Sequence, residues 1–198
     1  MLYILIPCKP LREGKSRLGD VLSDEDRYAL CRRLLRHSLT LALELQYAAG
    51  VRILTSDPEA SDLAAAHGVA TIDDGGAGLN EALRQARAGL LETTGGAATT
   101  LILPIDLPYA TADAVGRALE GAGDVVIAPD GERRGTNLLY LGPRAMRAFS
   151  FAFGPDSFTA HWDGALHAGL DVDILEDERL AFDLDRAEHY QWWLQNAG

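Results

Sequence analysis

The sequence predicts an α/β protein of three layers, α/β/α, in which helices cover both faces of a mixed, mostly parallel sheet. Over residues 1–128, short apolar runs alternate with segments of helical periodicity, which implies crossover connections between parallel strands. The pattern changes after the turn at residues 133–135, where a strand follows without a helix and indicates an antiparallel addition. No linker, internal repeat or low-complexity stretch divides the 198 residues, so we expect a single domain over residues 1–198.

The first half of the chain begins with an apolar strand at residues 2–6, which a long helix follows. Ser23 is a typical N-cap residue, and residues 24–26 are acidic, as the positive end of a helix dipole favours. Apolar residues then recur at helical spacing as far as Leu45. The next elements are a strand at 51–54, a short alanine-rich helix that ends at Gly68, a strand at 69–72 and a helix at about 79–91.

The second half is expected to continue the alternation and then to depart from it. Ser157 is expected to cap a helix, because its hydroxyl can accept a hydrogen bond from a free amide of the first turn. In order, the elements are a strand at 100–103, a helix at 112–119, a strand at 124–128, the antiparallel strand at 137–141, a helix at 157–168, a strand at 172–175 and a helix at 187–194.

Composition and charge exclude several classes of function. The formal net charge of -11 and a pI near 4.8 argue against nucleic-acid binding, which needs a broad basic surface. No apolar stretch approaches the ~18 residues of a transmembrane helix, and the apolar start lacks the charge pattern of a signal peptide. Cys8 and Cys31 lack C-x-x-C spacing, which favours a reduced, cytoplasmic setting. We therefore expect neither nucleic acid nor a membrane among the partners.

A basic segment follows the first strand. The first 19 residues carry four basic side chains and one acid, although the protein is acidic overall. Ligands of open α/β sheets bind outside the carboxyl ends of the strands, so Lys9, Lys15 and Arg17 are candidates to hold a polyanion such as a nucleoside triphosphate. Gly14 and Lys15 do not complete a P-loop, because that motif needs glycine where Lys9 stands. A solvated basic loop is the alternative.

Three carboxylates are candidate metal ligands. Asp106 follows an apolar strand and lies between two prolines, in a position where a carboxylate can hold Mg²⁺ in the ligand crevice. Asp183 and Asp185 are two residues apart, so in an extended segment both carboxylates face the same side and can reach one metal ion. The alternatives are a turn or cap role for Asp106 and a solvated surface position for the pair.

Small polar turns supply further candidates for ligand binding. A glycine loop at residues 75–78 opens a helix whose N-terminal amides favour an anion. Asn80, just inside that helix, carries both the donor and the acceptor needed to bind a nucleobase. Thr136 and Ser157 follow two other turns, and their hydroxyls can hold a carboxylate or phosphate, with turn and cap roles as the alternatives.

An ordered set of short motifs spans nearly the whole chain. The motifs are Pro7-Cys8-Lys9-Pro10, Lys15-Ser16-Arg17-Leu18, Gly78-Leu79-Asn80, Pro104-Ile105-Asp106-Leu107-Pro108, Ala128-Pro129-Asp130, Gly135-Thr136-Asn137, Phe153-Gly154-Pro155-Asp156-Ser157-Phe158 with His161, and Asp183-Leu184-Asp185. In them the chain resembles the guanylyltransferases that build the precursor of the deazaflavin coenzyme F-420. These are described as 2-phospho-L-lactate, phosphoenolpyruvate or 3-phospho-D-glycerate guanylyltransferases. The resemblance implies a nucleotidyltransferase fold of the GT-A type, shared with molybdenum-cofactor guanylyltransferases.

The resemblance also implies roles for individual residues. The chain departs from the family pattern in two places. Cys8 replaces a small β-branched residue, and the run from Arg186 to His189 replaces Thr-Pro-Glu-Asp. Lys9, Lys15, Arg17 and Asp106 form the expected catalytic group. In the family pattern, Lys9, Lys15 and Arg17 lie at the triphosphate, Gly78 and Asn80 at the base, Asp106, Asp183 and Asp185 at the metal ion, and Thr136, Gly154 and Ser157 at the phosphorylated acid.

The implied reaction is a Mg²⁺-dependent transfer of GMP from GTP to the phosphate of a small phosphorylated carboxylic acid, with release of pyrophosphate. An acceptor phosphate is already ionised near neutral pH, which agrees with the lack of a nucleophile motif such as G-x-S-x-G. The alternatives are a nucleotidyltransferase for molybdopterin or a sugar phosphate, and a catalytically silent nucleotide-binding protein. Trp192 and Trp193 are expected either to pack or to form a contact in a homodimer.

Overall fold

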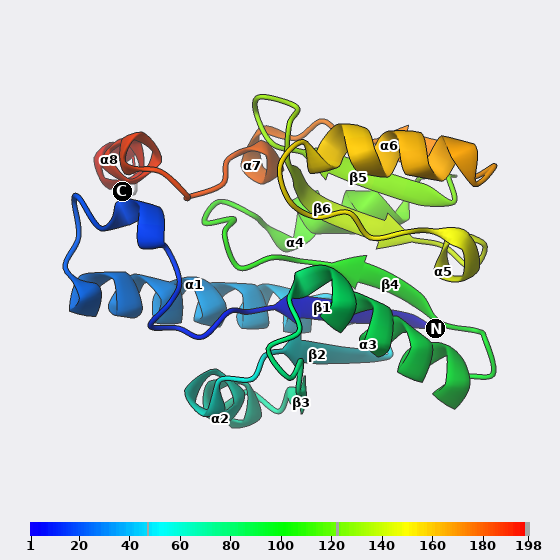
Figure 1. Cartoon of the computed structure of the whole chain (residues 1–198), viewed down its shortest axis with the longest axis horizontal. Helices are drawn as coiled ribbons and strands as arrows, with labels where there is room; N and C mark the ends of the chain where they lie inside the picture. The colour runs from blue at the N-terminus through cyan, green and yellow to red at the C-terminus, as the bar shows by residue number, and fades with distance from the viewer. Residues whose placement is uncertain (47, 122, 197–198) are drawn as a thin grey trace.

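The computed structural model describes residues 1–46, 48–121 and 123–196 and contains a seven-stranded sheet (Figure 1). The strands lie in the order β3-β2-β1-β4-β6-β5-β7. β6 is antiparallel to both of its neighbours, whereas the other pairs are parallel, so the predicted mixed sheet is confirmed. The strands are β1 (Leu2–Pro7), β2 (Gly50–Leu54), β3 (Ala70–Ile72), β4 (Thr99–Ile102), β5 (Val125–Pro129), β6 (Thr136–Leu141) and β7 (Val172–Ile174).

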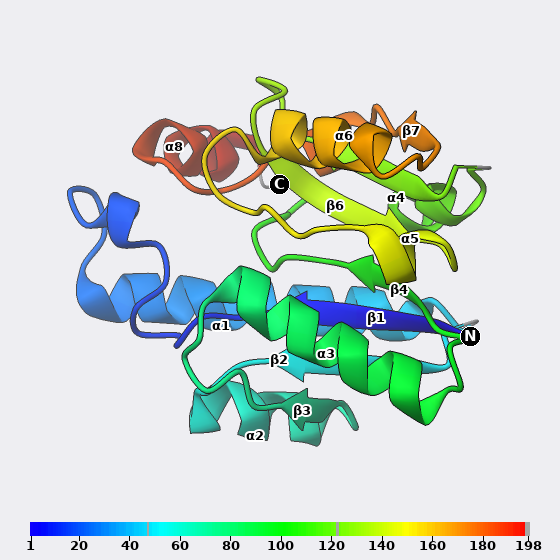
Figure 2. The same cartoon turned by 45° about the vertical axis from the view of Figure 1, so that its right-hand side comes forward.

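Helices cover both faces of the sheet, as Figures 1 and 2 show. Helices α1, α2, α4, α7 and α8 contribute to the core on one face, and α3, α5 and α6 to the core on the other. Among the described residues, none of the helices is both long and apolar enough to cross a bilayer. The helices are α1 (Asp24–Glu44), α2 (Pro58–Ala66), α3 (Leu79–Thr93), α4 (Ala112–Gly116), α5 (Ala145–Ala148), α6 (Ser157–His167), α7 (Glu178–Ala181) and α8 (Ala187–Asn196), with short 3-10 helices η1 (Ser16–Leu18) and η2 (Arg117–Leu119).

The two cores follow directly from the alternation of side chains along a strand. In β1, Ile4 and Ile6 point to the face covered by α1, whereas Leu5 points to the face covered by α3. All three side chains are fully buried. A central strand of this kind is apolar on both faces, which is why residues 2–6 form an unbroken apolar run.

The start of α1 confirms one capping prediction, and the start of α6 corrects another. The Ser23 hydroxyl accepts a hydrogen bond from the amide of Asp26 at 3.1 Å, as an N-cap does. Ser157 is not a cap, because α6 begins at Ser157 itself. The N-cap of α6 is Asp156, which has left-handed backbone angles (φ 54°) and makes no side-chain capping bond. The Ser157 hydroxyl is therefore available for other contacts.

The loops that matter for function gather at one edge of the sheet. β1, β4 and β5 all end at this edge, and β6 begins there because it runs in the opposite direction. The basic segment after β1, Asp106 after β4 and Thr136 at the start of β6 are thus brought to the same edge. A fourth segment joins them, since the amide of Leu184 donates to the carbonyl of Asp106 at 2.9 Å.

The C-terminal helix α8 closes the end of the molecule where η1 lies (Figure 1). Trp193 is buried in the core, and the guanidinium of Arg33 lies 4.7 Å from the centre of its ring. Trp192 is half exposed and packs edge-on against Tyr109 and at a tilt against Phe182. Trp193 therefore packs, and a contact between two copies of the chain through Trp192 stays a prediction.

Candidate active site

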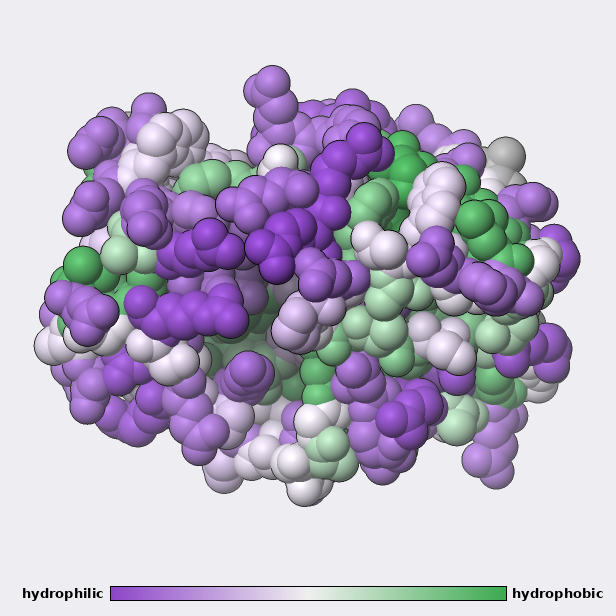
Figure 3. Space-filling model, turned by 45° about the horizontal axis from the view of Figure 1, so that its top comes forward, coloured by the Kyte–Doolittle hydropathy of each residue, from purple (hydrophilic) through white to green (hydrophobic). Residues whose placement is uncertain are grey.

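Two cavities adjoin at the carboxyl edge of the sheet. The larger has a volume of about 840 Å³ and the smaller about 500 Å³. Figure 3 shows a hollowed face with hydrophilic residues gathered around the opening. Lys15, Asp106 and Asp185 line both cavities, so this group of charges stands where the two spaces meet. A molecule in either cavity can therefore contact the same charged group.

Lys15 is the centre of this charged group. Its side chain is only 4% exposed, and its ammonium contacts the Asp106 carboxylate and lies 3.9 Å from Asp185 Oδ1. The guanidinium of Arg17 donates to Asp185 Oδ2 at 2.5 Å. A buried ammonium is costly unless it is paired, and here two carboxylates compensate it. Two cations and two carboxylates thus form one compact group.

The Asp183-Leu184-Asp185 segment has no regular secondary structure, and its side chains alternate between the core and the cavity. Leu184 is fully buried, and the flanking carboxylates both line the larger cavity. Burial raises the pKa of Asp183 above its ordinary value, the carboxylates of Asp185 and Asp106 raise it further, and His189 opposes the shift. A raised pKa shows that the negative charge on Asp183 is poorly compensated within this chain. A cation bound beside Asp183 would stabilise its negative charge.

The three carboxylates do not form a closed metal cage. Among residues 1–46, 48–121 and 123–196, no three His, Cys, Asp or Glu side chains are arranged to hold a metal ion. Instead, the ammonium of Lys15 lies between Asp106 and Asp185. The donor set still suits Mg²⁺, which binds one or two protein carboxylates and takes its remaining oxygen ligands from water and substrate phosphates. Lys15 marks the point where one positive charge contacts two carboxylates.

The turn between β5 and β6 presents Thr136 to the larger cavity. Asp130 accepts hydrogen bonds from the amides of Arg134 at 2.7 Å and Gly135 at 2.9 Å, and Arg133 has left-handed backbone angles (φ 55°). A Cβ atom on Gly135 would lie 2.9 Å from the Asp130 carboxylate, so a larger residue there would displace this carboxylate. The carboxylate of Asp130 therefore fixes the direction in which β6 leaves the edge.

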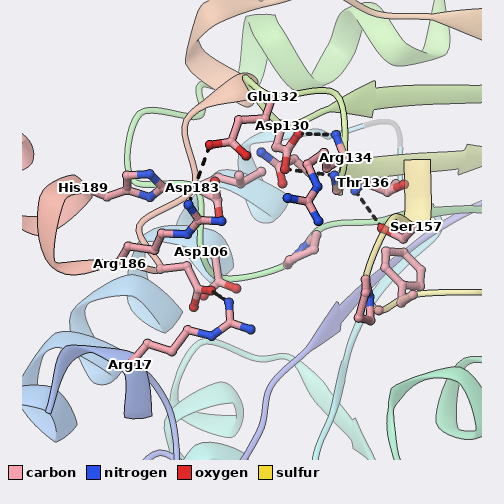
Figure 4. Close-up of a pocket in the computed structure, with 18 of the residues that line it drawn as sticks. Arg17, Asp106, Asp130, Glu132, Arg134, Thr136, Ser157, Asp183, Arg186 and His189 are labelled. Atoms are coloured by element: carbon pink, nitrogen blue, oxygen red, sulfur yellow. Dashed lines mark hydrogen bonds and ion pairs between the residues drawn. The ribbon is translucent and has the colours of Figure 1, made fainter. Parts of the chain in front are cut away.

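Thr136 and Ser157 come together at this end of the cleft. The Ser157 hydroxyl accepts from the Thr136 amide at 3.0 Å, and Thr136 Oγ1 lies 2.9 Å from Nδ1 of His161. Both residues are buried, yet both line the larger cavity. Figure 4 shows Thr136 and Ser157 across the cavity from Asp106 and Asp183. The cavity therefore has the carboxylates of Asp106 and Asp183 on one side and the hydroxyls of Thr136 and Ser157 on the other, which we call the hydroxyl side.

The amide of Asn80 is engaged within the protein. Its Nδ2 donates to the carbonyl of Phe153 at 2.9 Å, and its Oδ1 accepts from the Phe153 amide at 2.8 Å. These bonds tie the start of α3 to the loop that carries Gly154, which adopts a φ of 145° and lines the larger cavity. Asn80 thus positions a loop, and a direct contact with a nucleobase stays a prediction. Gly78 lines the smaller cavity.

Backbone strain is concentrated around the cleft. In the part of the chain that the structure describes, the non-glycine residues with positive φ are Lys15, Arg133 and Asp156. Lys15 and Asp156 line the larger cavity, and Arg133 lies between two residues that do. Left-handed backbone costs free energy in residues other than glycine, and such residues persist chiefly where surrounding structure enforces them, often at ligand sites.

The structure brings most of the predicted site residues together. Asn80 is set back from both cavities, and Gly78 lines only the smaller one. The predicted residues that line the larger cavity are Lys9, Lys15, Arg17, Asp106, Thr136, Gly154, Ser157, Asp183 and Asp185.

Sequence reasoning missed several residues of this site. Asp130 and His161 belong to the motifs that carry the family resemblance, but the sequence analysis assigned them no role. For His161 the signal was its spacing of four from Ser157, which places both on one helix face. Arg186 and His189, which depart from the family pattern, both line the larger cavity. The guanidinium of Arg186 lies 3.7 Å from the Glu132 carboxylate (Figure 4).

The fold is that of the nucleotidyltransferases. A solved structure that shares it is 4-diphosphocytidyl-2C-methyl-D-erythritol synthase, with a TM-score of 0.66 at 17% sequence identity. The similarity covers 98% of this chain and 96% of that one. The nucleotidyltransferase fold implied by the sequence motifs is confirmed.

Residues 2–192 match the family described as "Guanylyl transferase CofC like", and the chain belongs to this family. It is 40% identical over 190 residues to the phosphoenolpyruvate guanylyltransferase of Rubrobacter xylanophilus, covering 94% of this chain and 90% of the relative. It is 37% identical over 194 residues to the phosphoenolpyruvate guanylyltransferase of Chloroflexus aggregans, covering 95% and 94%. The protein is therefore a guanylyltransferase, as its motifs predict.

Proposed function

We propose that this protein transfers GMP from GTP to the phosphate of phosphoenolpyruvate and releases pyrophosphate. The observation that carries the proposal is the pair of cavities that adjoin at the charged group of Lys15, Arg17, Asp106 and Asp185. Two substrates that react with each other need two binding spaces that adjoin, so that the reacting atoms can meet at the boundary. The family and the names of the two relatives support the choice of nucleotide and acceptor.

The smaller cavity is the better fit to the nucleoside part of GTP. Its wall includes the glycine loop at Gly76 and Gly78, together with Ser56, Asp74 and Leu79. The basic residues stand at the boundary with the larger cavity, where the triphosphate would extend. The hydroxyl side of the larger cavity, with Thr136 and Ser157, is then left for the acceptor acid.

The proposed reaction needs alignment and charge neutralisation more than proton transfer. An oxygen of the acceptor phosphate forms a bond to the α-phosphorus of GTP, and the bond between that phosphorus and the bridging oxygen to the β-phosphorus breaks. The electron pair leaves with pyrophosphate. Lys9, Lys15 and Arg17 offset the charge on this leaving group, and the hydroxyl side of the cleft holds the acceptor in line. An ionised phosphate needs no general base.

We also propose that Mg²⁺ binds at Asp106, Asp183 and Asp185 and supplies electrostatic stabilisation of the reacting phosphates. The donor chemistry, the raised pKa of Asp183 and the ammonium between Asp106 and Asp185 support this assignment. Lys15 would leave the carboxylates for the phosphates when the cation binds. A role in coenzyme F-420 biosynthesis and a cytoplasmic location complete the proposal, and the free thiols of Cys8 and Cys31 agree with a reducing compartment.

A product assay tests this function. The protein is incubated with GTP, Mg²⁺ and, in separate reactions, phosphoenolpyruvate, 2-phospho-L-lactate or 3-phospho-D-glycerate, and the products are weighed by mass spectrometry. We expect a diphosphate-linked guanosyl product that forms fastest from phosphoenolpyruvate, and little product when ATP or CTP replaces GTP. Faster turnover of another acid would reassign the acceptor, and no product from any of the three would refute the proposed function.

A further inference from the structure

His161 lies directly behind the hydroxyl side of the cleft. It is fully buried on α6, one turn after Ser157, and it does not line either cavity. The rings of Phe149 and Phe153 enclose it, with centroids 5.3 Å and 4.7 Å from the imidazole. A polar ring in such surroundings is costly unless both nitrogens are hydrogen-bonded. Both nitrogens have partners.

The partner of Nε2 decides where the ring carries its proton. The amide of Ala152 donates to Nε2 at 2.9 Å. A backbone N–H can only donate, so Nε2 must be the unprotonated nitrogen of the ring. In neutral imidazole the remaining proton then lies on Nδ1. Burial lowers the pKa of His161 to about 4, which keeps the ring neutral near pH 7.

The proton on Nδ1 fixes the role of the neighbouring hydroxyl. Nδ1 lies 2.9 Å from Thr136 Oγ1, so Nδ1–H donates and the hydroxyl oxygen accepts. The hydroxyl hydrogen of Thr136 must therefore point elsewhere. The Ser157 oxygen accepts from the Thr136 amide, so its hydrogen is likewise directed away. Among the contacts of the described residues, neither hydroxyl hydrogen has an acceptor, and both residues face the larger cavity.

We propose that His161 is a positioning residue that makes the Thr136 hydroxyl a hydrogen-bond donor toward an anionic oxygen of the acceptor acid. The opposite tautomer would draw the hydroxyl hydrogen toward the ring and turn a lone pair to the cavity, which repels an anion. With Ser157, the site offers two donors to a carboxylate or phosphate, groups that only accept hydrogen bonds when ionised. This inference rests on the proposed function, because the acceptor acid supplies the anion.

Two substitutions of His161 separate its two hydrogen bonds. The side-chain amide of His161→Asn can place a donor near the Nδ1 position, whereas that of His161→Gln can place an acceptor near the Nε2 position. We expect His161→Gln to raise the KM for the acceptor about tenfold, the effect of one lost hydrogen bond. The KM for GTP should stay unchanged. His161→Asn should retain most of the acceptor affinity, even where it lowers the melting temperature.

A double-mutant cycle tests whether His161 acts through Thr136. Thr136→Val removes the hydroxyl and keeps the shape of the side chain, so the effect of His161→Gln on the acceptor KM should disappear in that background. An undiminished effect would overturn the proposal, as would equal effects of His161→Gln on the two KM values. If the wild-type protein forms no product from any acid, the proposed function fails instead, and this inference fails with it.

The tautomer can also be measured without catalysis or substitution. In the wild-type protein labelled with ¹⁵N at histidine, the resonances of His161 distinguish a protonated nitrogen from an unprotonated one. We expect Nδ1 protonated and Nε2 unprotonated at pH 7. A protonated Nε2 would overturn the proposal, whatever the variants do.

Discussion

At the scale of single residues, the site depends on one buried cation that is paired with partly exposed carboxylates. Lys15 is a buried cation in a left-handed backbone conformation, enclosed by the carboxylates of Asp106 and Asp185. Gly14 before it is just as constrained, since a Cβ atom there would lie 2.6 Å from the sulfur of Cys31. The Gly14-Lys15 pair therefore serves a tight turn over α1, and the structure shows no resemblance to a phosphate-binding P-loop at this point.

Lys15→Ala should weaken the binding of GTP at least about tenfold more than the binding of GMP. The ammonium is assigned to the outer phosphates, and one charge-assisted hydrogen bond is worth roughly 1.5 to 3 kcal/mol. Isothermal titration calorimetry with both nucleotides measures the difference. Arg12→Ala is the matched control, because Arg12 lies in the same segment but pairs with Glu25 at the surface and lines neither cavity. Equal losses for GTP and GMP in Lys15→Ala would contradict the assignment.

At the scale of secondary-structure elements, the sequence predicts the long and periodic elements well. The apolar runs and the Ser23 cap lead to β1 and α1 with errors of a residue or so at the ends. The helices α5 and α7 have four residues each, too few for a helical period to show. The predicted helix at 112–119 changes to 3-10 geometry after Gly116. Local sequence patterns do not predict these short helices or the change to 3-10 geometry, because tertiary contacts determine them.

The same limit applies to the site. Residue type and position, after a strand for Lys15 and Asp106 and in a turn for Thr136, were sufficient to select these residues. Nothing in the sequence shows that Lys15 would lie between two carboxylates 91 and 170 positions away, or that the Asn80 amide would bind Phe153. Those contacts depend on which strands are neighbours. In particular, β6 lies between β4 and β5, an order that alternation along the chain cannot reveal.

The turn between β5 and β6 gives a prediction at this scale. Gly135→Ala should displace the Asp130 carboxylate, loosen the amides of residues 134 and 135, and shift Thr136, raising the KM for the acceptor by up to about tenfold. Gly131→Ala in the same turn is the control, because its Cβ would lie 3.8 Å from the Ala181 carbonyl, an ordinary contact. Steady-state kinetics on both variants, with GTP saturating, make the comparison. Equal KM values for the two variants would show that Asp130 does not position Thr136.

At the scale of the whole molecule, His161 links the site to the pH dependence of folding. Its folded-state pKa of about 4 lies below the unfolded value near 6.5, so the unfolded chain binds the proton more readily. Its contribution to stability is complete above pH 6.5 and is lost as the pH falls toward 4. The loss approaches about 3 kcal/mol, from roughly 1.36 kcal/mol for each pKa unit. Asp183, with a raised pKa, contributes with the opposite sign.

Urea denaturation of the wild-type protein and His161→Asn between pH 7 and pH 4.5 measures this contribution. The free energy of unfolding of the wild-type protein should fall more steeply than that of the variant, because the variant has no ring to protonate. All carboxylates are common to the two proteins, so their contributions to the pH dependence cancel in the difference between the two unfolding free energies. Parallel curves would mean that His161 is already charged, or exposed, in the folded protein.

The smaller cavity and the hydroxyl side of the larger one are built from different stretches of the chain. With the exception of Asp185, the smaller cavity is lined by residues between positions 7 and 106, whereas the hydroxyl side of the larger one is lined by residues between 130 and 157, with His161 behind it. One stretch can thus diversify in evolution while the other is held constant. Exchange of residues 130–161 between members of the family should transplant the preference for the acceptor acid and leave the preference for the purine base where it was.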